Sequence, residues 1–433
     1  MLKQLVEKFF NIQINSVCEF LEAEVDSKRV KPNSIFFALQ GKKTDGHLYL
    51  DEAIENGAVL AVVDEKKEIK QQKIPCIYVQ DPLETLQLLA KYHFAFIGAE
   101  TIAITGSVGK STTKEYVAQL LSSHYKVGKT RGNQNSQVGL ALSLIALKGD
   151  EEKLVLEMGM SEKGNIHKLC EIASPDIAVL TSIDVNHIEQ FGSKEAISEE
   201  KSSIFTPQTI QFSYIEENAY SYEAVKRKCH SEKMIYSLKE HIQNGRFKVL
   251  DFEIDLELLN IKEEHFLKNL IPAVAIARKL HVPNEKILEK IIDLQTLEHR
   301  FQLITKKRCL IIDDAYNSSL ESLNCAISTI SQRQIQGKKI AVIGALGEQG
   351  DLEELHHQKM AEILEGHFDQ IYCTGTPAQT TVRFLKKKGQ NAFYFDSLKD
   401  IAESLNQELQ FNDLLFLKGA NSYRLWELVD LIL

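Results

Sequence analysis

Hydrophobic and polar positions divide the chain into three successive stretches of alternating strands and helices. The first stretch holds three short apolar runs typical of buried strands, with one amphipathic helix between the first two. These runs span residues 34–39, 59–64 and 76–79. Asp81 and Pro82 then have the form of a helix N-cap and first turn, and apolar residues share one helical face up to residue 93. We therefore expect a small α/β module over 1–81, followed by a helix that opens a second domain.

The second stretch predicts a mostly parallel sheet. A strand at 101–105 runs into a glycine turn and then a helix over about 111–124, which is the order of a phosphate-binding strand–turn–helix unit. Two more buried-type strands follow at 153–159 and 176–181, and each ends in polar residues where a parallel sheet presents its ligand crevice. Residues 251–258 alternate strictly between polar and apolar, which predicts a half-exposed antiparallel strand.

From about residue 300, five apolar runs recur with amphipathic helices between them. The runs are CLIIDD, KIAVIGA, QIYCTG, AFYFD and LLFLKG. Such alternation predicts a doubly wound, Rossmann-like domain. The expected fold is therefore α/β with three domains: a small α/β module at 1–81, a central domain with a mostly parallel sheet at 82–298, and a Rossmann-like domain at 299–433.

Charge and composition narrow the classes of function. With 51 basic and 60 acidic residues the net charge is −9, which gives little general support for a nucleic-acid-binding surface. The seven cysteines include no metal-type C-x-x-C pair and are expected to be reduced core thiols. The longest nearly apolar run, 139–147, is far shorter than the roughly 20 residues that span a bilayer. We expect a cytoplasmic protein that neither binds nucleic acid nor inserts into a membrane.

One segment carries the chemistry of phosphate binding. ITGSVGKSTT, residues 104–113, combines a strand end, two glycines and a Lys-Ser-Thr helix start. Backbone N–H groups and the helix N-terminus form an anion cradle there, Lys110 can reach the outer phosphates of a nucleotide, and the Ser111 hydroxyl can bind Mg²⁺. The usual G-x-x-x-x-G-K-[ST] motif would require glycine at Ile104, so this loop is shortened. The predicted nucleotide-binding residues are Gly106, Ser107, Val108, Gly109, Lys110, Ser111, Thr112 and Thr113.

Further hard ligands for Mg²⁺ should come from the ends of neighbouring strands. Glu157 closes the LVLE run, and His187 follows the next strand at the same edge of the predicted sheet. The alternatives are a solvated glutamate at a strand end and a structural histidine. Ser111, Glu157 and His187 are therefore our candidate metal ligands from the residues alone.

Seven motifs together resemble the Mur ligases of peptidoglycan synthesis. In chain order they are TGSVGKSTTKE, GNQNSQVG, LEMG, NHIEQFGS, EEKSSIF, EHRFQ and DDAYNS, and their separations are similar to those of the family. Residues 25–47 also resemble the family's UDP-sugar module. The resemblance covers nearly the whole chain, and the run of motifs is far more specific than any single one.

The resemblance implies an ATP-dependent ligase that forms an amide bond through an acyl phosphate and releases ADP and phosphate. It implies an N-terminal domain for the UDP end of the substrate, a central P-loop ATPase, and a C-terminal domain that brings the incoming amino component. The motifs are most similar to those of members that add D-alanyl-D-alanine to UDP-N-acetylmuramoyl-tripeptide. These two compounds are the implied partners, ATP and Mg²⁺ the implied cofactors, and a monomer the implied state.

Two lysines have distinct parts in that chemistry. A carboxylate and a γ-phosphate must be brought together, and Lys110 with Mg²⁺ would offset their repulsion. Lys201 would repel a second Mg²⁺ as a free ammonium, but family members carry a carbamylated lysine at this motif, and CO₂ turns the cation into a carboxylate-like anion that suits a hard metal. The resemblance therefore implies that Lys201 is a carbamylated metal ligand. The alternative is an ordinary surface lysine.

The resemblance also places other residues at the substrates. Arg300 is implied at the γ-phosphate, Asp314 at the ATP ribose and Asn269 near the adenine, whereas a hinge salt bridge is the alternative for Arg300 and Asp314. The implied substrate contacts are Ser27, Asp45, Gly46 and His47 in the UDP module, Asn133 and Asn135 in GNQNSQVG, and Tyr316 and Asn317 in the C-terminal domain.

The chain departs from the family pattern mainly where the amino substrate is chosen. The D-N-P-R signature of the diaminopimelate-adding members is missing from the sequence. The D-D-x-Y-N-A-N-P signature keeps Tyr316 and Asn317, but Ser319 and Leu320 replace the last Asn and Pro. Further replacements are Phe266 for asparagine, Ala345 for aspartate and Ala420 for serine.

Three alternatives to a D-alanyl-D-alanine ligase therefore stay open. The first is another ligase of the family, which adds diaminopimelate or lysine. The second is a folate polyglutamate ligase, which would not need the UDP module. The third is a nucleotide-binding regulator that has lost catalysis.

Overall fold

The computed structural model describes residues 2–14, 22–41, 44–69, 72–184, 188–306, 309–347 and 349–432. The chain forms two compact units. The first comprises residues 1–183, 198–254 and 269–291, and the second comprises residues 184–197, 255–268 and 292–433.

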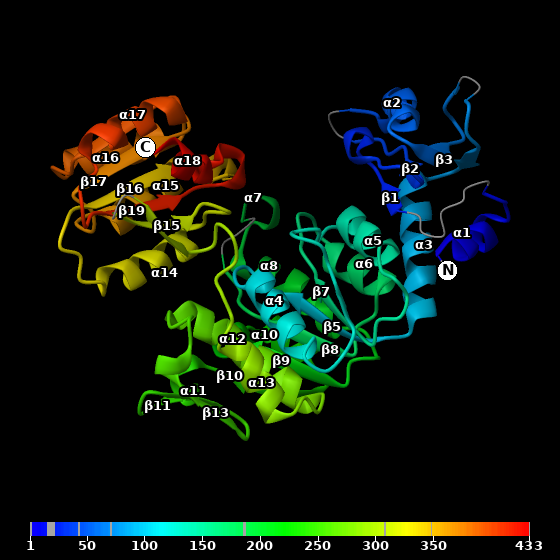
Figure 1. Ribbon diagram of the computed structural model, residues 1–433, viewed down its shortest axis with the longest axis horizontal. Coiled ribbons are helices and arrows are strands. Elements are labelled where there is room, and N and C mark those ends of the chain that lie inside the picture. Colours follow the sequence, from blue (N-terminus) through cyan, green and yellow to red (C-terminus); the bar gives the residue numbers. More distant parts are fainter. Residues whose placement is uncertain are drawn as a thin grey trace. The chain divides into compact units, whose positions relative to one another are not determined.

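The first unit begins with a four-stranded parallel sheet in the order β1-β2-β3-β4, of which β1, β2 and β3 are labelled in Figure 1. Its elements are β1 (Glu22–Glu24), β2 (Ser34–Phe37), β3 (Ala58–Asp64), β4 (Cys76–Val79) and the helices α1 (Leu2–Phe10) and α2 (Leu50–Glu55). The predicted runs are confirmed as β2, β3 and β4, and β2 is buried along its whole length. The sequence did not predict β1 because it is only three residues long.

The same unit holds a six-stranded sheet that is parallel throughout, in the order β10-β9-β8-β5-β7-β6. Its strands are β5 (Glu100–Thr105), β6 (Val127–Lys129), β7 (Lys153–Glu157), β8 (Ile177–Leu180), β9 (Phe212–Glu216) and β10 (Glu232–Tyr236). The helices of this part of the chain are α3 (Pro82–Ile97), α4 (Lys110–Leu121), α5 (Gln137–Ile145), α6 (Asn165–Ile172), α7 (Ile188–Phe191), α8 (Lys194–Lys201), α9 (Glu217–Tyr220) and α10 (Glu223–Lys228). The predicted parallel sheet is thus confirmed.

Helix α3 starts and ends where its sequence predicts. Asp81 is its N-cap and accepts hydrogen bonds from the amides of Leu83 at 2.8 Å and Glu84 at 3.1 Å. Pro82 occupies the first turn, and Gly98 ends the helix in the left-handed region with φ +63°. The helix packs against α5.

A small three-stranded sheet follows in the order β11-β12-β13. Its elements are α11 (Leu238–His241), β11 (Ile242–Gln243), β12 (Arg246–Val249) and β13 (Phe252–Asp255), and the next helices are α12 (Glu264–Lys279) and α13 (Asn284–Ile291). The β11–β12 pair is antiparallel, and β13 alternates between buried and exposed residues as its sequence predicts.

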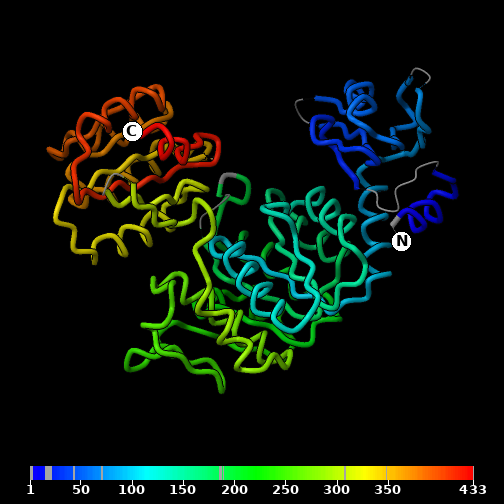
Figure 2. Tube along the Cα trace, in the orientation of Figure 1, coloured from blue at the N-terminus to red at the C-terminus, as the bar shows by residue number. Residues whose placement is uncertain are grey.

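The second unit contains a six-stranded sheet in the order β14-β15-β19-β16-β17-β18, coloured yellow to red in Figure 2. Only β14 is antiparallel to its neighbour among these described strands. The strands are β14 (Gln302–Lys306), β15 (Cys309–Asp314), β16 (Lys339–Gly344), β17 (Gln370–Thr374), β18 (Ala392–Phe395) and β19 (Leu414–Lys418). The helices are α14 (Leu320–Ser331), α15 (Glu353–Leu364), α16 (Ala378–Lys387), α17 (Leu398–Glu408) and α18 (Leu428–Leu431), with α14 and α17 on opposite sides of the sheet (Figure 1).

The five apolar runs after residue 300 are confirmed as β15 to β19, and the expected α/β fold with mostly parallel sheets is confirmed with them. The domain bounds at 81/82 and 298/299 stay a prediction.

Of the described cysteines, Cys325 is exposed and Cys76 is partly exposed, so only the other four are core thiols. No described helix combines the length and apolar character that crossing a bilayer requires.

Candidate active site

The predicted phosphate loop lies between β5 and α4, and two residues of the next strand end shape it. Thr181 Oγ1 donates to the carbonyl of Val108 at 2.6 Å, and the amide of Val108 donates to Ser182 Oγ at 2.8 Å. The amide of Ser107 donates to the carbonyl of Ser182 at 3.0 Å. Because Thr181 and Ser182 directly follow β8, which pairs with β5, the sheet itself fixes the shape of the loop.

Glycine is required at both ends of this loop. Gly106 has φ +153° and Gly109 has φ +89°, conformations that side chains with a Cβ rarely adopt. A Cβ at Gly106 would overlap Thr181 Oγ1, and a Cβ at Gly109 would overlap Asn269 Oδ1. Asn269 Oδ1 also accepts from Thr113 Oγ1 at 3.3 Å. The structure therefore brings Asn269, on α12, against the predicted loop.

Lys110 is the first residue of α4 and folds back onto the loop. Its ammonium donates to the carbonyls of Gly106 at 2.7 Å and Ser107 at 3.1 Å. Ser111 and Thr112 in the same helical turn are buried. Since a helix N-terminus favours an anion, the charge of Lys110 adds to an existing phosphate-binding field.

Lys201 ends α8 and is buried, with 2% of its surface exposed, so it is not a surface lysine. Burial lowers the pKa of its ammonium well below the ordinary lysine value, and the nearby charge of Lys110 lowers it further. Glu200 accepts from the amides of Gly164 at 2.7 Å and Ile166 at 2.8 Å at the start of α6, which fixes the end of α8. Burial therefore shifts Lys201 toward its neutral amine, although the charge of Glu200 opposes this shift in part.

Glu157 ends β7 with 1% of its surface exposed, so it is not a solvated glutamate at a strand end. Its Oε1 accepts from Asn135 Nδ2 at 2.8 Å, whereas its Oε2 has no hydrogen-bond partner among the described residues. A buried carboxylate oxygen costs free energy until it gains a partner, and a hard divalent cation is a suitable one. Glu157 therefore fits the predicted role of Mg²⁺ ligand.

The other residues that the sequence places near Glu157 are His187, Asn133 and Asn135. His187 lies outside the described residues. The amide of Asn135 donates to the carbonyl of Asn133 at 2.7 Å, which closes a tight turn in the GNQNSQVG segment. Because the Asn135 side chain binds Glu157, it supports the predicted metal ligand. The substrate contacts of Asn133 and Asn135 stay a prediction.

In the second unit, Arg300 lies in a strained turn. His299 and Phe301 on either side of it have φ +58° and +53°, in the left-handed region that residues other than glycine rarely adopt. His299 Nδ1 hydrogen-bonds Asp313 Oδ2 at 2.6 Å, and its ring stacks on Trp426 with ring centres 4.7 Å apart. These two contacts hold the turn that presents Arg300.

Three more predicted residues of the second unit gather beside this turn. The Arg300 guanidinium lies 4.1 Å from the centre of the Tyr316 ring. Asp314 accepts from the buried Lys418 Nζ at 2.6 Å, and Lys418 also donates to the carbonyl of Asn317 at 3.2 Å. The structure thus brings Arg300, Asp314, Tyr316 and Asn317 together, and a salt bridge of Asp314 with Lys418 orders them.

Two of the departures from the family pattern, Ser319 and Phe266, have local explanations. Ser319 is the N-cap of α14 and accepts from the amide of Ser322 at 3.2 Å, so serine performs the capping that asparagine also performs well. Leu320 follows at the first helical position, where proline is favoured. Phe266 is buried and packs edge-on against Phe301 with ring centres 6.4 Å apart. Nothing in the structure explains Ala345 or Ala420.

Of the predicted UDP contacts, Asp45 and His47 belong to one polar network, and the amide of Gly46 between them donates to the carbonyl of Leu39 at 2.8 Å. Asp45 hydrogen-bonds His47 Nδ1 at 2.6 Å and accepts from Lys67 Nζ at 2.6 Å. His47 Nε2 accepts from the amide of Asp64 at 3.0 Å. Burial raises the pKa of Asp45, but the hydrogen bonds from Lys67 and His47 outweigh it and lower the pKa to about 2.

Ser27, the other predicted UDP contact, is buried beside α2. Its Oγ donates to Glu52 Oε2 at 2.5 Å. The UDP contacts of this module stay predictions.

Sequence reasoning missed three residues that support predicted site residues of their own unit: Lys114 and Glu200 in the first unit and Lys418 in the second. Lys114 lies one helical turn after Lys110 and Glu200 precedes Lys201, so each adjoins a predicted residue. Lys418 ends the last strand of the second unit at the same sheet edge as Asp314. Their positions next to predicted site residues could have identified them. However, lysine and glutamate are common in the sequence, so position alone did not distinguish these three from other lysines and glutamates.

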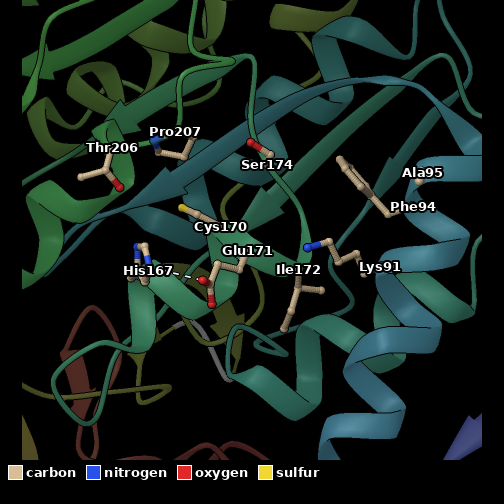
Figure 3. Close-up of a pocket in the computed structure, with 10 residues that line it drawn as sticks. All are labelled: Lys91, Phe94, Ala95, His167, Cys170, Glu171, Ile172, Ser174, Thr206 and Pro207. Carbon is tan, nitrogen blue, oxygen red and sulfur yellow. Dashed lines mark ion pairs between the residues drawn. The ribbon is translucent and has the colours of Figure 1, made fainter.

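A separate surface pocket of about 460 Å³ lies on the first unit (Figure 3). Its lining comes from α3, α6 and two loops: Lys91, Phe94, Ala95, His167, Cys170, Glu171, Ile172, Ser174, Thr206 and Pro207. Ser174 precedes β8, whereas the phosphate loop follows β5, so the pocket lies at the opposite edge of the parallel sheet. None of the predicted site residues lines it.

Three family descriptions match successive parts of the chain. "Mur ligase family, catalytic domain" matches residues 23–94, "Mur ligase middle domain" matches 104–276, and "Mur ligase, glutamate ligase domain" matches 299–421. The order of these matches follows the three stretches expected from the hydrophobic pattern.

Two curated relatives match nearly the whole chain. The UDP-N-acetylmuramoyl-tripeptide–D-alanyl-D-alanine ligase of Bacillus subtilis is 30% identical over 423 residues, which cover 94% of this chain and 92% of the relative. The ligase of the same name from Rickettsia prowazekii is 29% identical and covers 97% of this chain and 96% of the relative.

Two solved structures have the same fold. The MurF ligase of Thermotoga maritima in complex with ADP is 28% identical, with a TM-score of 0.79 and coverage of 95% of this chain and 96% of that one. A MurF structure from Acinetobacter baumannii is 25% identical, with a TM-score of 0.81 and coverage of 99% and 98%. Together with the 30% identity to the Bacillus subtilis ligase, these matches establish that the chain belongs to the Mur ligase family.

Proposed function

We propose that this chain is an ATP-dependent ligase that joins D-alanyl-D-alanine to UDP-N-acetylmuramoyl-tripeptide and releases ADP and phosphate. The names of the Bacillus subtilis and Rickettsia prowazekii relatives and the ADP complex of the Thermotoga maritima structure support this reading. One observation carries it: Glu157, paired with Ile104 just before the phosphate loop, buries a carboxylate oxygen that has no hydrogen-bond partner in the described chain. Such an oxygen suits the cation that accompanies ATP.

The proposed reaction has two steps. An oxygen of the peptide's terminal carboxylate attacks the γ-phosphorus, and the bond from that phosphorus to ADP breaks. The amine of the dipeptide then attacks the acyl carbon, the carbon–oxygen bond to phosphate breaks, and the amine loses a proton to solvent. The loop amides and Lys110 reduce the repulsion between carboxylate and phosphate in the first step.

Magnesium supplies charge stabilisation at the transferred phosphate when it is bound. Ser111 and Glu157 would hold one magnesium ion, together with His187 as the sequence predicts, and the modified Lys201 would hold a second. The Asn135 side chain keeps Glu157 Oε1 in place, so that Oε2 is the atom left for the cation.

Carbamylation of Lys201 agrees with its surroundings. The reaction joins the neutral amine nitrogen to the carbon of CO₂ and releases one proton, which leaves a carbamate anion. Burial and the charge of Lys110 favour the neutral amine, which is the form that reacts. Mass spectrometry under CO₂ should show the added mass, and a short carboxylic acid should restore activity to Lys201→Ala. If the added mass is absent and the short carboxylic acid restores no activity, this part of the proposal is refuted.

The other predicted residues would contact the substrates. Arg300 and Asp314 would contact the γ-phosphate and the ribose of ATP, and Asn269 of the first unit the adenine. Tyr316 and Asn317 would contact the dipeptide. Ser27 and the Asp45–His47 network would contact the UDP end of the other substrate.

Measuring phosphate release tests the function directly. With ATP and UDP-N-acetylmuramoyl-tripeptide, we expect sustained release only when D-alanyl-D-alanine is added, together with a product of matching mass. Sustained release with a UDP-dipeptide and diaminopimelate or lysine would instead assign another ligase of the family. No amine-dependent release with any of these substrates would indicate a regulator and overturn the proposal.

A further inference from the structure

We propose that Lys114 is a positioning residue with two tasks: it is the counter-charge of Glu157 before a divalent cation binds, and it anchors the turn at 130–132. This inference rests on the proposed function, because it takes Glu157 as the cation ligand.

Lys114 is almost completely buried, with 1% of its surface exposed. Its ammonium donates to the carbonyls of Thr130 at 3.1 Å and Gly132 at 2.7 Å. It also forms an ion pair with Glu115 at 3.1 Å, and its Nζ lies 3.9 Å from Glu157 Oε2. Every one of these groups is an acceptor or an anion, so the buried charge is well compensated.

The turn that Lys114 anchors also holds Glu157. Thr130 Oγ1 accepts from the amide of Glu157 at 3.0 Å, and Asn135, further along the same segment, donates to Glu157 Oε1 at 2.8 Å. Helix α4, the 130–135 segment and the end of β7 therefore form one closed set of contacts around Glu157. Of the three side chains described here around Glu157, those of Lys114, Thr130 and Asn135, Lys114 alone carries a positive charge.

The distance from Lys114 to Glu157 Oε2 explains how Lys114 can act as a counter-charge and still leave this oxygen available to a cation. At 3.9 Å the two groups attract each other electrostatically but do not form a hydrogen bond, so the oxygen keeps its lone pairs for a cation. A divalent cation at this oxygen must also approach the ammonium, which repels it. Lys114 therefore stabilises the cation-free protein and weakens the binding of a free cation.

Removal of the charge should reverse both effects. In Lys114→Met without nucleotide, we expect Mn²⁺, followed by electron paramagnetic resonance, to bind at least tenfold more tightly than in the unchanged protein. The variant should also have a lower Tm without cation and a larger rise in Tm when Mn²⁺ is added. Loss of the turn's anchor should raise KM for the UDP-linked peptide more than it lowers kcat.

Lys129→Met is the matched control. Lys129 also pairs with Glu115, but its side chain is 44% exposed. The same substitution there should leave Mn²⁺ affinity and the KM of the UDP-linked peptide unchanged. Lys114→Arg is the conservative variant, which keeps the charge and should keep the weak Mn²⁺ affinity even if Lys114→Met does not fold.

The outcomes separate this inference from the proposed function. If the unchanged protein binds Mn²⁺ and Glu157→Gln abolishes that binding, but Lys114→Met binds no more tightly than before, only the role of Lys114 is refuted. If Lys114→Arg binds Mn²⁺ tenfold more tightly, the role of its charge is likewise refuted. If Glu157→Gln leaves Mn²⁺ binding intact, the cation role of Glu157 in the proposed function fails as well.

Discussion

Each of the two units holds a cation that the sequence predicts to bind ATP phosphates, and the two units hold these cations by different means. Lys110 in the first unit follows a loop whose two glycines adopt their conformations at little cost, and hydrogen bonds from the neighbouring strand end complete it. Arg300 in the second unit lies between two residues with positive φ that are not glycine. Its turn persists because the side chains of Asp313 and Trp426 hold His299.

This difference predicts which kind of substitution should disrupt each of the two regions. The loop of the first unit depends on the absence of side-chain atoms, so an added methyl group should disrupt it. The turn of the second unit depends on the presence of particular side chains, so their removal should disrupt it. The same difference explains why a motif identifies the first site more readily than the second.

The largest effect is expected from Gly109→Ala. Its φ of +89° and the overlap of an added Cβ with Asn269 Oδ1 oppose the substitution together. We expect phosphate release to fall by roughly a hundredfold or more because the phosphates are misplaced. Gly98→Ala is the control: that glycine also has a positive φ, at +63°, but no atom lies within 4 Å of an added Cβ. It should cost about 1 kcal/mol of stability and leave turnover unchanged. Equal losses in both variants would contradict the steric argument.

Removal of a side chain tests the second unit. Lys418→Met leaves the carboxylate of Asp314 without its buried cation, and we expect the second unit to lose about 3 kcal/mol of unfolding free energy. Trp426 is the chain's one tryptophan, so its fluorescence during urea unfolding reports on this unit. Lys399→Met, at an exposed lysine of α17, should change the unfolding free energy by less than about 0.5 kcal/mol. A loss no larger than that control would show that the Lys418 pair is not needed.

The sequence predicted those parts of the fold and site that local residue preferences determine. Buried parallel strands appear as continuous apolar runs, and the phosphate loop appears because glycine is needed there. Strand β14 and the three-residue β1 carry no such signal. The burial of Glu157 and Lys201, and the contacts of Lys114, depend on which distant segments the fold brings together. A single sequence does not contain that information in local form.

The pH dependence of the second unit sharpens the comparison further. Burial, together with the neighbouring Asp184, raises the pKa of Glu321 on α14 from 4.5 to about 8. The folded unit therefore holds a proton that the unfolded chain releases, and its stability falls as pH rises through this window. Glu321→Gln should match the unchanged protein near pH 5 and exceed its unfolding free energy by roughly 1 kcal/mol near pH 9. Glu403→Gln, at an exposed residue of α17, should show no such pH-dependent gain.

The smallest expected effect concerns a departure from the family pattern. Leu320 occupies the first position of α14, and Ser319 before it has φ −141° and ψ 161°, an extended conformation that a following proline requires. We therefore expect Leu320→Pro to leave the unfolding free energy unchanged or to raise it by up to about 0.5 kcal/mol. Leu323→Pro is the opposite case, because the amide of Leu323 donates to the carbonyl of Ser319 at 2.9 Å, and it should cost about 3 kcal/mol or more. If Leu320→Pro were as damaging as Leu323→Pro, the helix would not begin where Ser319 caps it, and the turn that carries Tyr316 and Asn317 would need another explanation.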